Sequence, residues 1–205
     1  MQTTLPRLDV ANADFVTPAL AIGGDLDPTL FRALEQLDEL VDAGVTHILD
    51  VRIEGSDAEF VARHHPEIAY LHHGVDDAGQ RIPDAWFEEG VRWVTMASEA
   101  RGVVLVHCHM GVNRGPSLGY AVLLAQGWDP IEAVDAIRGA RPVAALAYAA
   151  DALEWHHRRT GGTTTALRRD LRRLAVWRRA NDVELGNIVR QVMRDERQVP
   201  TWEVL

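Results

Sequence analysis

Apolar residues follow two different rhythms along this chain of 205 residues. Short apolar runs between turn residues predict buried β-strands, and longer stretches with an apolar residue every three or four positions predict amphipathic helices. Strands are predicted at 14–23 (two short strands), 45–51, 67–72 and 103–107, and helices at 28–43, 56–63, 85–100, 130–139 and 145–158, with another directly after residue 114. Strands that alternate with helices indicate an α/β fold, with a central, mostly parallel sheet flanked by helices.

Two residues mark the starts of predicted helices. Asp84 stands directly before the helix at 85–100 and is predicted to be its N-cap. Pro116 falls in the first turn of the helix that follows Arg114, where a missing N–H costs nothing. The chain is therefore expected to pass from the strand at 103–107 through a short loop into that helix.

A linker signal divides the chain. The segment 160–165, Thr-Gly-Gly-Thr-Thr-Thr, separates a domain at 1–159 from an extension at 163–205. Leucines recur at helical spacing among paired arginines in the extension, and a second amphipathic stretch follows at 185–193. Two interpretations stay open: helices that pack on the domain or on a second copy in a homodimer, and an arginine-rich arm for an acidic partner or an anionic membrane.

Composition narrows the class of protein. All 21 basic residues are arginine, with 10 against 24 acidic residues in 1–157 (net −14) and 11 against 6 in 158–205 (net +5). An acidic domain has no general attraction to nucleic acid, so nucleic-acid partners are not expected. No apolar run approaches the roughly 18 residues that span a bilayer, so no integral membrane contact is expected. The N-terminus lacks signal-peptide features, and a single cysteine fits a reducing compartment, which predicts a cytoplasmic location.

The strongest chemical signal surrounds the only cysteine, Cys108. It follows the apolar strand directly, and Arg114 stands six residues later at the start of a helix. Positive potential at a helix N-terminus stabilises a thiolate and binds a phosphate dianion through backbone N–H groups. Gly111 allows positive φ within the loop, and the planar fork of Arg114 can hold two phosphate oxygens. The loop is predicted to be a phosphate cradle with a nucleophile, and its substrate-binding residues are His109, Met110, Gly111, Val112, Asn113 and Arg114.

The run His107-Cys108-(five residues)-Arg114 resembles the signature of the protein tyrosine phosphatase superfamily. The flanking segments are similar to the dual-specificity phosphatase family over about 14–157. Rhodanese-type domains and low-molecular-weight tyrosine phosphatases fit less well, because here an acidic loop precedes the cysteine. An inert buried cysteine fits less well too, because of the strand–loop–helix context and the spacing to arginine. The resemblance implies a cysteine-dependent phosphatase that acts on phosphotyrosine and phosphoserine/threonine in proteins through a phosphocysteine intermediate, without a cofactor.

The resemblance also implies a general acid before the nucleophile. Asp76 and Asp77 both stand in the matching loop, and Asp77 has the family spacing of ten residues to the aromatic Phe87. Asp77 is therefore predicted to protonate the leaving oxygen. The alternative is that both aspartates serve only the turn. His107 is implied to orient the loop, and His109 lies on its rim.

The sequence departs from the family pattern in two places. Relatives carry serine or threonine directly after the arginine, where the hydroxyl helps the thiolate leave the phosphoenzyme. Gly115 occupies this position here, and Ser117 supplies the next hydroxyl, with an expected supporting role. The stretch 143–148 also lacks the asparagine that braces the signature loop in relatives. Hydrolysis of the intermediate is therefore expected to be slow or assisted differently.

Other functions remain open at this stage. The histidine pairs 64–65, 72–73 and 156–157 lack the spacing of zinc ligands, so no metal is predicted. The same chemistry could act on a small or lipid phosphoester, such as an inositol phosphate, a sugar phosphate or a nucleotide. The loop has no basic residue beyond Arg114 to favour that substrate class. A non-catalytic phosphate-binding module is the third interpretation, against which the intact Cys108, Asp77 and Arg114 argue.

Overall fold

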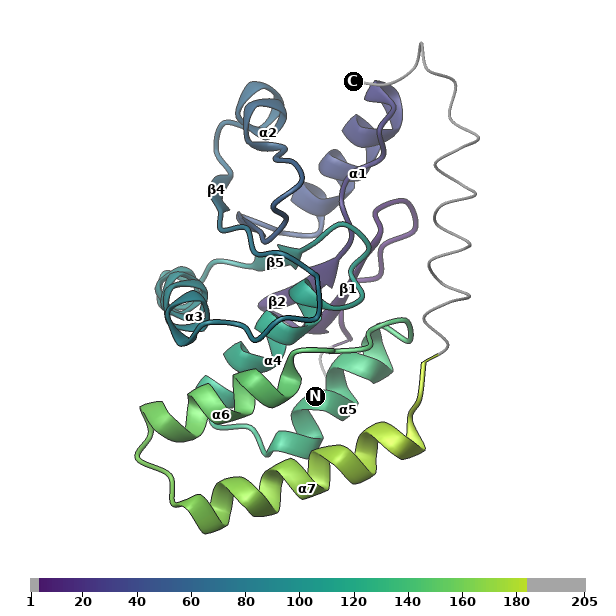
Figure 1. Cartoon of the computed structure of the whole chain (residues 1–205). Coiled ribbons are helices and arrows are strands. Elements are labelled where there is room, and N and C mark those ends of the chain that lie inside the picture. The colour runs from purple at the N-terminus through teal and green to yellow at the C-terminus, as the bar shows by residue number, and fades with distance from the viewer. Residues whose placement is uncertain (1–3, 184–205) are drawn as a thin grey trace.

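Five strands form one sheet at the centre of the computed structural model, which describes residues 4–183 (Figure 1). The strands are β1 (Ala13–Thr17), β2 (Leu20–Gly23), β3 (His47–Asp50), β4 (Ala69–His72) and β5 (Val104–His107). Their order across the sheet is β1-β2-β5-β3-β4. Only the β1–β2 pair is antiparallel, and the other neighbours are parallel. The prediction of an α/β fold with a mostly parallel sheet is confirmed.

Seven helices surround the sheet in the described part of the chain. They are α1 (Leu30–Asp42), α2 (Ala58–His64), α3 (Asp84–Glu99), α4 (Arg114–Ala125), α5 (Pro130–Ala140), α6 (Ala149–Arg159) and α7 (Thr164–Ala180). The predicted N-cap at Asp84 is wrong: Pro83 holds that position, and the Asp84 carboxylate binds Arg158 instead. Helix α6 begins four residues later than predicted, because Leu146 takes a positive φ of 51° that interrupts the helix.

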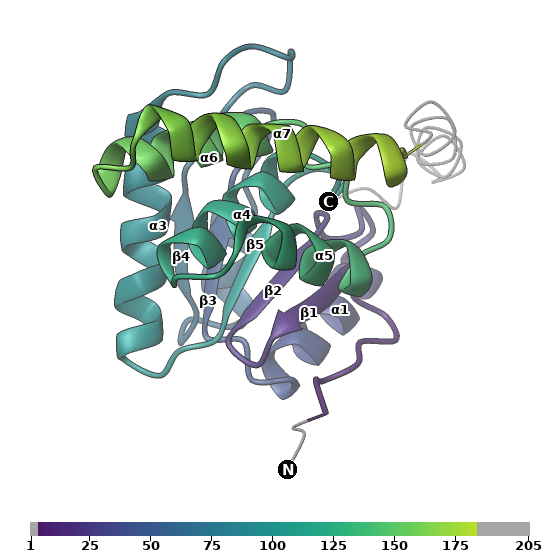
Figure 2. The ribbon, with the colours of Figure 1, turned by 90° about the horizontal axis from the view of Figure 1, so that it is seen from below.

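Each face of the sheet carries its own hydrophobic core. In β2, Leu20 and Ile22 face one core and Ala21 faces the other, as expected for strands buried on both sides. Helices α3 to α7 cover the first core and α1 and α2 the second. Figure 2 shows α4 and α5 between the sheet and the outer pair α6 and α7. This packing of helices on both faces fixes the direction of the strands. It therefore sets the edge of the sheet at which the loops after the parallel strands gather.

The four parallel strands end at the same edge of the sheet. Their following loops carry Asp25 after β2, Glu54 after β3, Asp77 after β4 and Cys108 after β5. In parallel α/β sheets, ligands bind outside the carboxyl ends of the strands. The fold therefore brings four distant loops together around the predicted nucleophile.

Helix α7 packs on α5 and α6 rather than standing apart. Residues 160–163 form a short turn, and Thr163 caps α7 by accepting a hydrogen bond from the Ala166 N–H. Leu174 and Trp177 are buried in the same core as α4, and Arg173 pairs with Asp129 of the domain. Within the predicted linker, residues 160–163 thus form a turn between packed helices, and residues 164 and 165 belong to α7. The second predicted amphipathic stretch lies outside the described residues.

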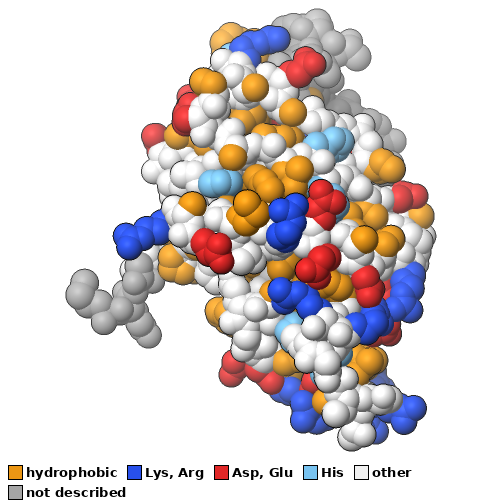
Figure 3. Space-filling view, turned by 90° about the vertical axis from the view of Figure 1, so that its left-hand side faces the viewer, with side chains coloured by type: hydrophobic (Ala, Val, Ile, Leu, Met, Phe, Trp, Pro, Cys, Tyr) orange, Lys and Arg blue, Asp and Glu red, His pale blue; other side chains and the backbone are white. Residues whose placement is uncertain are grey.

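Arginines also gather on the outer face of α7. Figure 3 shows blue side chains collected at the end of the molecule where α6 joins α7. Arg168 and Arg172 are exposed and have no ion pair within residues 4–183. Binding of an acidic partner or a second copy through this helix stays a prediction. No helix within 4–183 has both the length and the apolar character to cross a bilayer.

Replacing Trp177 by alanine is expected to destabilise the whole domain. The indole is buried, its Nε1–H donates to Asp135, and the Arg138 guanidinium lies 5.1 Å from the ring centroid. Loss of a buried tryptophan costs about 3–5 kcal/mol of unfolding free energy, to be measured by urea denaturation. Val176→Ala is the matched control, because that neighbour is 61% exposed. An unchanged denaturation midpoint for Trp177→Ala would show that α7 does not support the core.

Candidate active site

A cavity of about 350 Å³ lies beside the loop between β5 and α4. Its walls are Asp77, Cys108, His109, Met110, Val112, Asn113 and Arg114. The structure thus places the predicted nucleophile, arginine and acid around one space, together with four of the predicted loop residues. Of the other predicted residues, Gly111 belongs to the same loop, while His107 and Ser117 lie behind it.

The loop carbonyls point away from the cavity. The four carbonyl oxygens of 109–112 all accept hydrogen bonds from outside the loop: from Asp25 N–H (3.1 Å), Arg141 Nη2 (3.0 Å), Arg141 Nε (2.7 Å) and Ala145 N–H (2.8 Å) in chain order. Within the described chain, no hydrogen bond uses the N–H groups of 110–113. Successive outward carbonyls leave these N–H groups as a concave nest of partial positive charge, the backbone arrangement that binds anions.

Arg141 is the main brace of this loop. Its guanidinium is almost fully buried and is itself held by Asn12 Oδ1 and Asp14 Oδ2, each at 2.8 Å. Gly111 has a φ of +64°, and a Cβ there would collide with the Arg141 guanidinium. The loop therefore needs glycine at this position. Arg141 and the Ala145 N–H together replace the asparagine brace that the resemblance led us to expect.

Arg114 offers one edge of its guanidinium to the cavity. Of its five N–H donors, Nη1 uses two, to Glu54 Oε2 (2.7 Å) and to the Val75 carbonyl (3.1 Å). Nη2 uses one, to Glu54 Oε1 (2.5 Å), and the buried Nε has no hydrogen-bond partner within 4–183. The two remaining donors, Nε–H and the second Nη2–H, lie on one edge of the fork. That edge matches two oxygens of a phosphate.

Glu54 holds the guanidinium in this orientation. The hydrogen bonds from Arg114 lower the pKa of Glu54 to about 2, so the carboxylate stays ionised and the pair persists until the pH falls near that value. Burial alone would lower the pKa of Arg114, but Glu54 and the charges of Cys108 and Asp77 raise it. Sequence reasoning missed Glu54, because a single glutamate after a strand is common.

The structure separates the two candidate acids. Asp77 lies at the cavity, with Oδ2 3.6 Å from Arg114 Nε and 3.5 Å from Asn113 Nδ2. Its other oxygen, Oδ1, accepts a hydrogen bond of 2.7 Å from the Tyr148 phenol. Asp76 is exposed, and its carboxylate accepts a hydrogen bond from the Asp77 N–H (2.8 Å), which is a turn contact. Of the two aspartates, only Asp77 lines the cavity.

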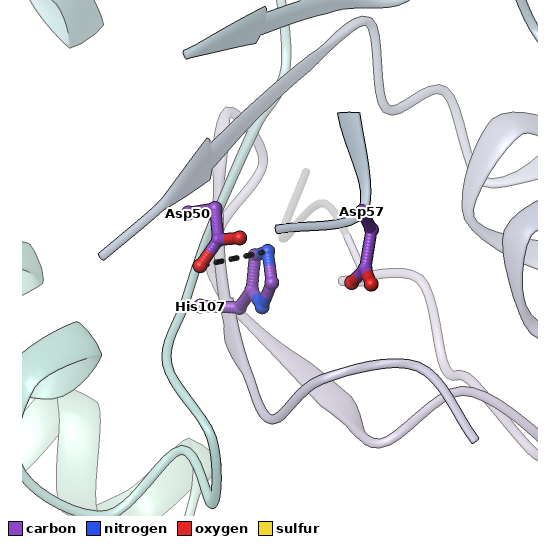
Figure 4. A group of neighbouring side chains, drawn as sticks. All are labelled: Asp50, Asp57 and His107. Carbon is purple, nitrogen blue, oxygen red and sulfur yellow. Dashed lines mark ion pairs between the residues drawn. The ribbon is translucent and has the colours of Figure 1, made fainter. Parts of the chain in front are cut away.

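His107 lies behind the nucleophile in a buried ionic group. Figure 4 shows it between Asp50 and Asp57, with Nε2 3.8 Å from Asp50 Oδ1. Three such side chains could hold a metal ion, but Arg52 already binds Asp50 (2.9 Å) and Asp57 (2.6 Å). Burial alone would raise the pKa of Asp50, yet hydrogen bonds from Arg52 hold it below its usual value. Burial lowers the pKa of His107, which favours the neutral ring.

Three other predicted residues take supporting positions. His109 lies on the rim and is 2.8 Å from Asp25 Oδ2 through Nδ1. Ser117 is fully buried, and its hydroxyl accepts a hydrogen bond of 3.2 Å from the Tyr148 N–H rather than facing the cavity. At Gly115, a Cβ would lie 3.3 Å from the Cys108 nitrogen. A hydroxyl at this position would therefore stand beside the nucleophile, and glycine leaves it out.

The comparisons with known proteins show the family to which this fold belongs. The sequence model of the dual specificity phosphatase catalytic domain matches residues 32–155, more than half of the chain. The chain therefore belongs to the dual specificity phosphatase family. No curated protein sequence matches it.

Solved structures of this family share the fold. Human DUSP28 has a TM-score of 0.59 at 24% identity, over 73% of this chain and 95% of that one. A mouse putative dual specificity phosphatase complexed with zinc tungstate has a TM-score of 0.60 at 25% identity, over 77% and 93%. PTPMT1 in complex with PI(5)P has a TM-score of 0.59 at 18% identity, over 73% and 97%. The similar structures thus include one that holds a phosphoinositide.

Proposed function

We propose that this chain hydrolyses phosphomonoesters of proteins, on tyrosine and on serine or threonine, through a phosphocysteine intermediate. The observation that carries this proposal is one edge of the Arg114 guanidinium, whose Nε–H and second Nη2–H make no hydrogen bond within residues 4–183, in a residue that lines the same cavity as Cys108. Together with the loop N–H groups, this edge supplies the positive field that a transferring phosphoryl group requires. The acid Asp77 lies beside that edge.

The proposed reaction has two steps, formation and hydrolysis of a phosphocysteine. In the first, the Cys108 thiolate forms a bond to phosphorus as the ester P–O bond breaks, and protonated Asp77 gives its proton to the leaving oxygen. In the second, water attacks phosphorus, Asp77 takes the proton of that water, and the sulfur leaves as thiolate. Arg114 and the loop N–H groups hold the phosphoryl oxygens throughout, and no metal ion or cofactor takes part.

The charges around the cavity favour a substrate with a single phosphate. Among residues 4–183, Arg114 is the only arginine in the cavity wall, and the carboxylates of Glu54 and Asp77 flank it. A second phosphate on an inositol ring or a nucleotide would meet this negative charge at close range. A phosphorylated side chain in a neutral or basic peptide avoids that repulsion.

Turnover of matched substrates tests the proposal. A phosphotyrosine peptide, a phosphothreonine peptide, phosphatidylinositol 5-phosphate in vesicles and a sugar phosphate are compared by release of inorganic phosphate. We expect the highest kcat/KM for one of the peptides. A higher value for the lipid or the sugar would assign the chain to a small or lipid phosphoester. Binding of all four without turnover of any would indicate a phosphate-binding module.

Replacing Asp77 by asparagine is expected to slow substrates with poor leaving groups most. The amide cannot give a proton, so phosphoserine-type esters should lose about 10²–10⁴ in kcat/KM. For p-nitrophenyl phosphate, whose leaving group is stable as an anion, the loss should stay below about tenfold. The basic limb of the pH profile of kcat/KM should also flatten.

The neighbouring aspartate is the matched control for this prediction. Asp76→Asn should change little, because that side chain only caps the turn. If Asp76→Asn shows the leaving-group effect and Asp77→Asn does not, the acid is misassigned by one residue.

A further inference from the structure

The phenol of Tyr148 reaches from the start of α6 to the proposed acid. It donates to Asp77 Oδ1 at 2.7 Å and accepts a hydrogen bond of 3.1 Å from the Gly79 N–H in the same loop. The side chain is buried in the core that also holds α4. Its backbone N–H is bound to Ser117 of α4. Tyr148 therefore connects the acid loop to the helix that follows the signature loop.

The hydrogen-bond directions fix where the acid can carry its proton. A phenol has one donor, and since its oxygen accepts from Gly79, its hydrogen is used on Asp77 Oδ1. Burial, followed by the bond to Asp77, raises the pKa of Tyr148 to about 12, so the phenol stays protonated at neutral pH. The proton of the carboxylic acid must then sit on Oδ2. That oxygen faces Arg114 Nε at 3.6 Å and Asn113 Nδ2 at 3.5 Å.

We propose that Tyr148 is a positioning residue for proton transfer, which holds Asp77 with its acidic proton on the oxygen that faces the bound phosphoester. This inference rests on the proposed function of Asp77. Without the phenol, the carboxyl group can rotate and carry its proton on either oxygen, and the Gly79 N–H loses its acceptor. Fewer molecules then present the proton to the leaving oxygen, while the phosphate cradle is unaffected.

The test is a leaving-group series with Tyr148→Phe. This change keeps the ring and removes only the hydroxyl. We expect kcat/KM for phenyl phosphate to fall about tenfold to a hundredfold, which is the range for a lost hydrogen bond to a charged group. For p-nitrophenyl phosphate, kcat/KM should fall less than about threefold. The affinity for inorganic phosphate as a competitive inhibitor should stay within about twofold. Tyr120→Phe is the control, because that tyrosine is also buried and its phenol has no hydrogen-bond partner within 4–183.

A double variant distinguishes a positioning role of Tyr148 from general damage to the fold. Combined with Asp77→Asn, Tyr148→Phe should cause no further loss with phenyl phosphate, because the group it positions is already disabled. An equal loss in both backgrounds, or an unchanged leaving-group dependence in the single variant, would overturn the inference. If the proposed function itself is wrong, the wild-type chain will not turn over p-nitrophenyl phosphate.

Discussion

Cys108→Ser is expected to abolish turnover while leaving phosphate binding largely intact. The sulfur is the nucleophile that the proposed mechanism uses in this cavity wall, and a serine hydroxyl lacks its ready ionisation. The loss should be on the order of 10⁴-fold or more in kcat, as for other enzymes without their nucleophile. The loop N–H groups and Arg114 remain, so inorganic phosphate should still bind, which isothermal titration can measure. Rapid quenching of the wild-type enzyme should trap a phosphocysteine.

The same experiment tests metal independence. The wild-type enzyme should keep its activity after dialysis against EDTA, because Arg114 and the loop supply the charge that a metal would otherwise provide. Retained activity in Cys108→Ser, or loss of wild-type activity with EDTA, would contradict the proposed mechanism.

The signature loop could be predicted from the sequence because its parts are local. Cys108 and Arg114 are six residues apart, and the strand before them and the helix after them are set by neighbouring residues. The apolar run 103–106 and Pro116 are both visible in the sequence. The same holds for the mostly parallel sheet, which the alternation of strands and helices predicts.

The residues that support the loop could not be predicted in the same way. Glu54 is 60 residues from Arg114, Tyr148 is 71 from Asp77, and Arg141 is 30 from Gly111. Their approach depends on which strands are neighbours and on where α5 ends and α6 begins, and no local pattern in the sequence marks these residues.

The wrong N-cap at Asp84 has the same origin. Local rules favour aspartate at that position, but Arg158, 74 residues away, binds its carboxylate with two hydrogen bonds. Helix α3 then begins at Asp84 itself, after Pro83. A charge pair made by tertiary packing replaced the cap that the sequence favoured.

Arg114→Lys is expected to impair both binding and turnover, unlike the change at Cys108. An ammonium carries its three donors on one atom, so it cannot bind Glu54 on one edge and present a flat pair of donors on another. Removal of such contacts to a developing charge costs about 10²–10³ in kcat/KM. Glu54, which is held by two hydrogen bonds in the wild type, would lose its fixed partner.

The readouts for Arg114→Lys are the steady-state constants and the affinity for inorganic phosphate, each compared with Arg172→Lys. Arg172 is exposed on α7 and has no ion pair within the described chain, so its exchange should change neither. If Arg114→Lys kept wild-type kcat/KM, the fork geometry would be irrelevant and charge alone would suffice. If it lost turnover but kept full phosphate affinity, Arg114 would act on the transition state only, and the cradle would consist of the loop N–H groups. A loss of both affinity and rate is the outcome expected if the Nε–Nη2 edge of Arg114 binds two oxygens of the phosphate.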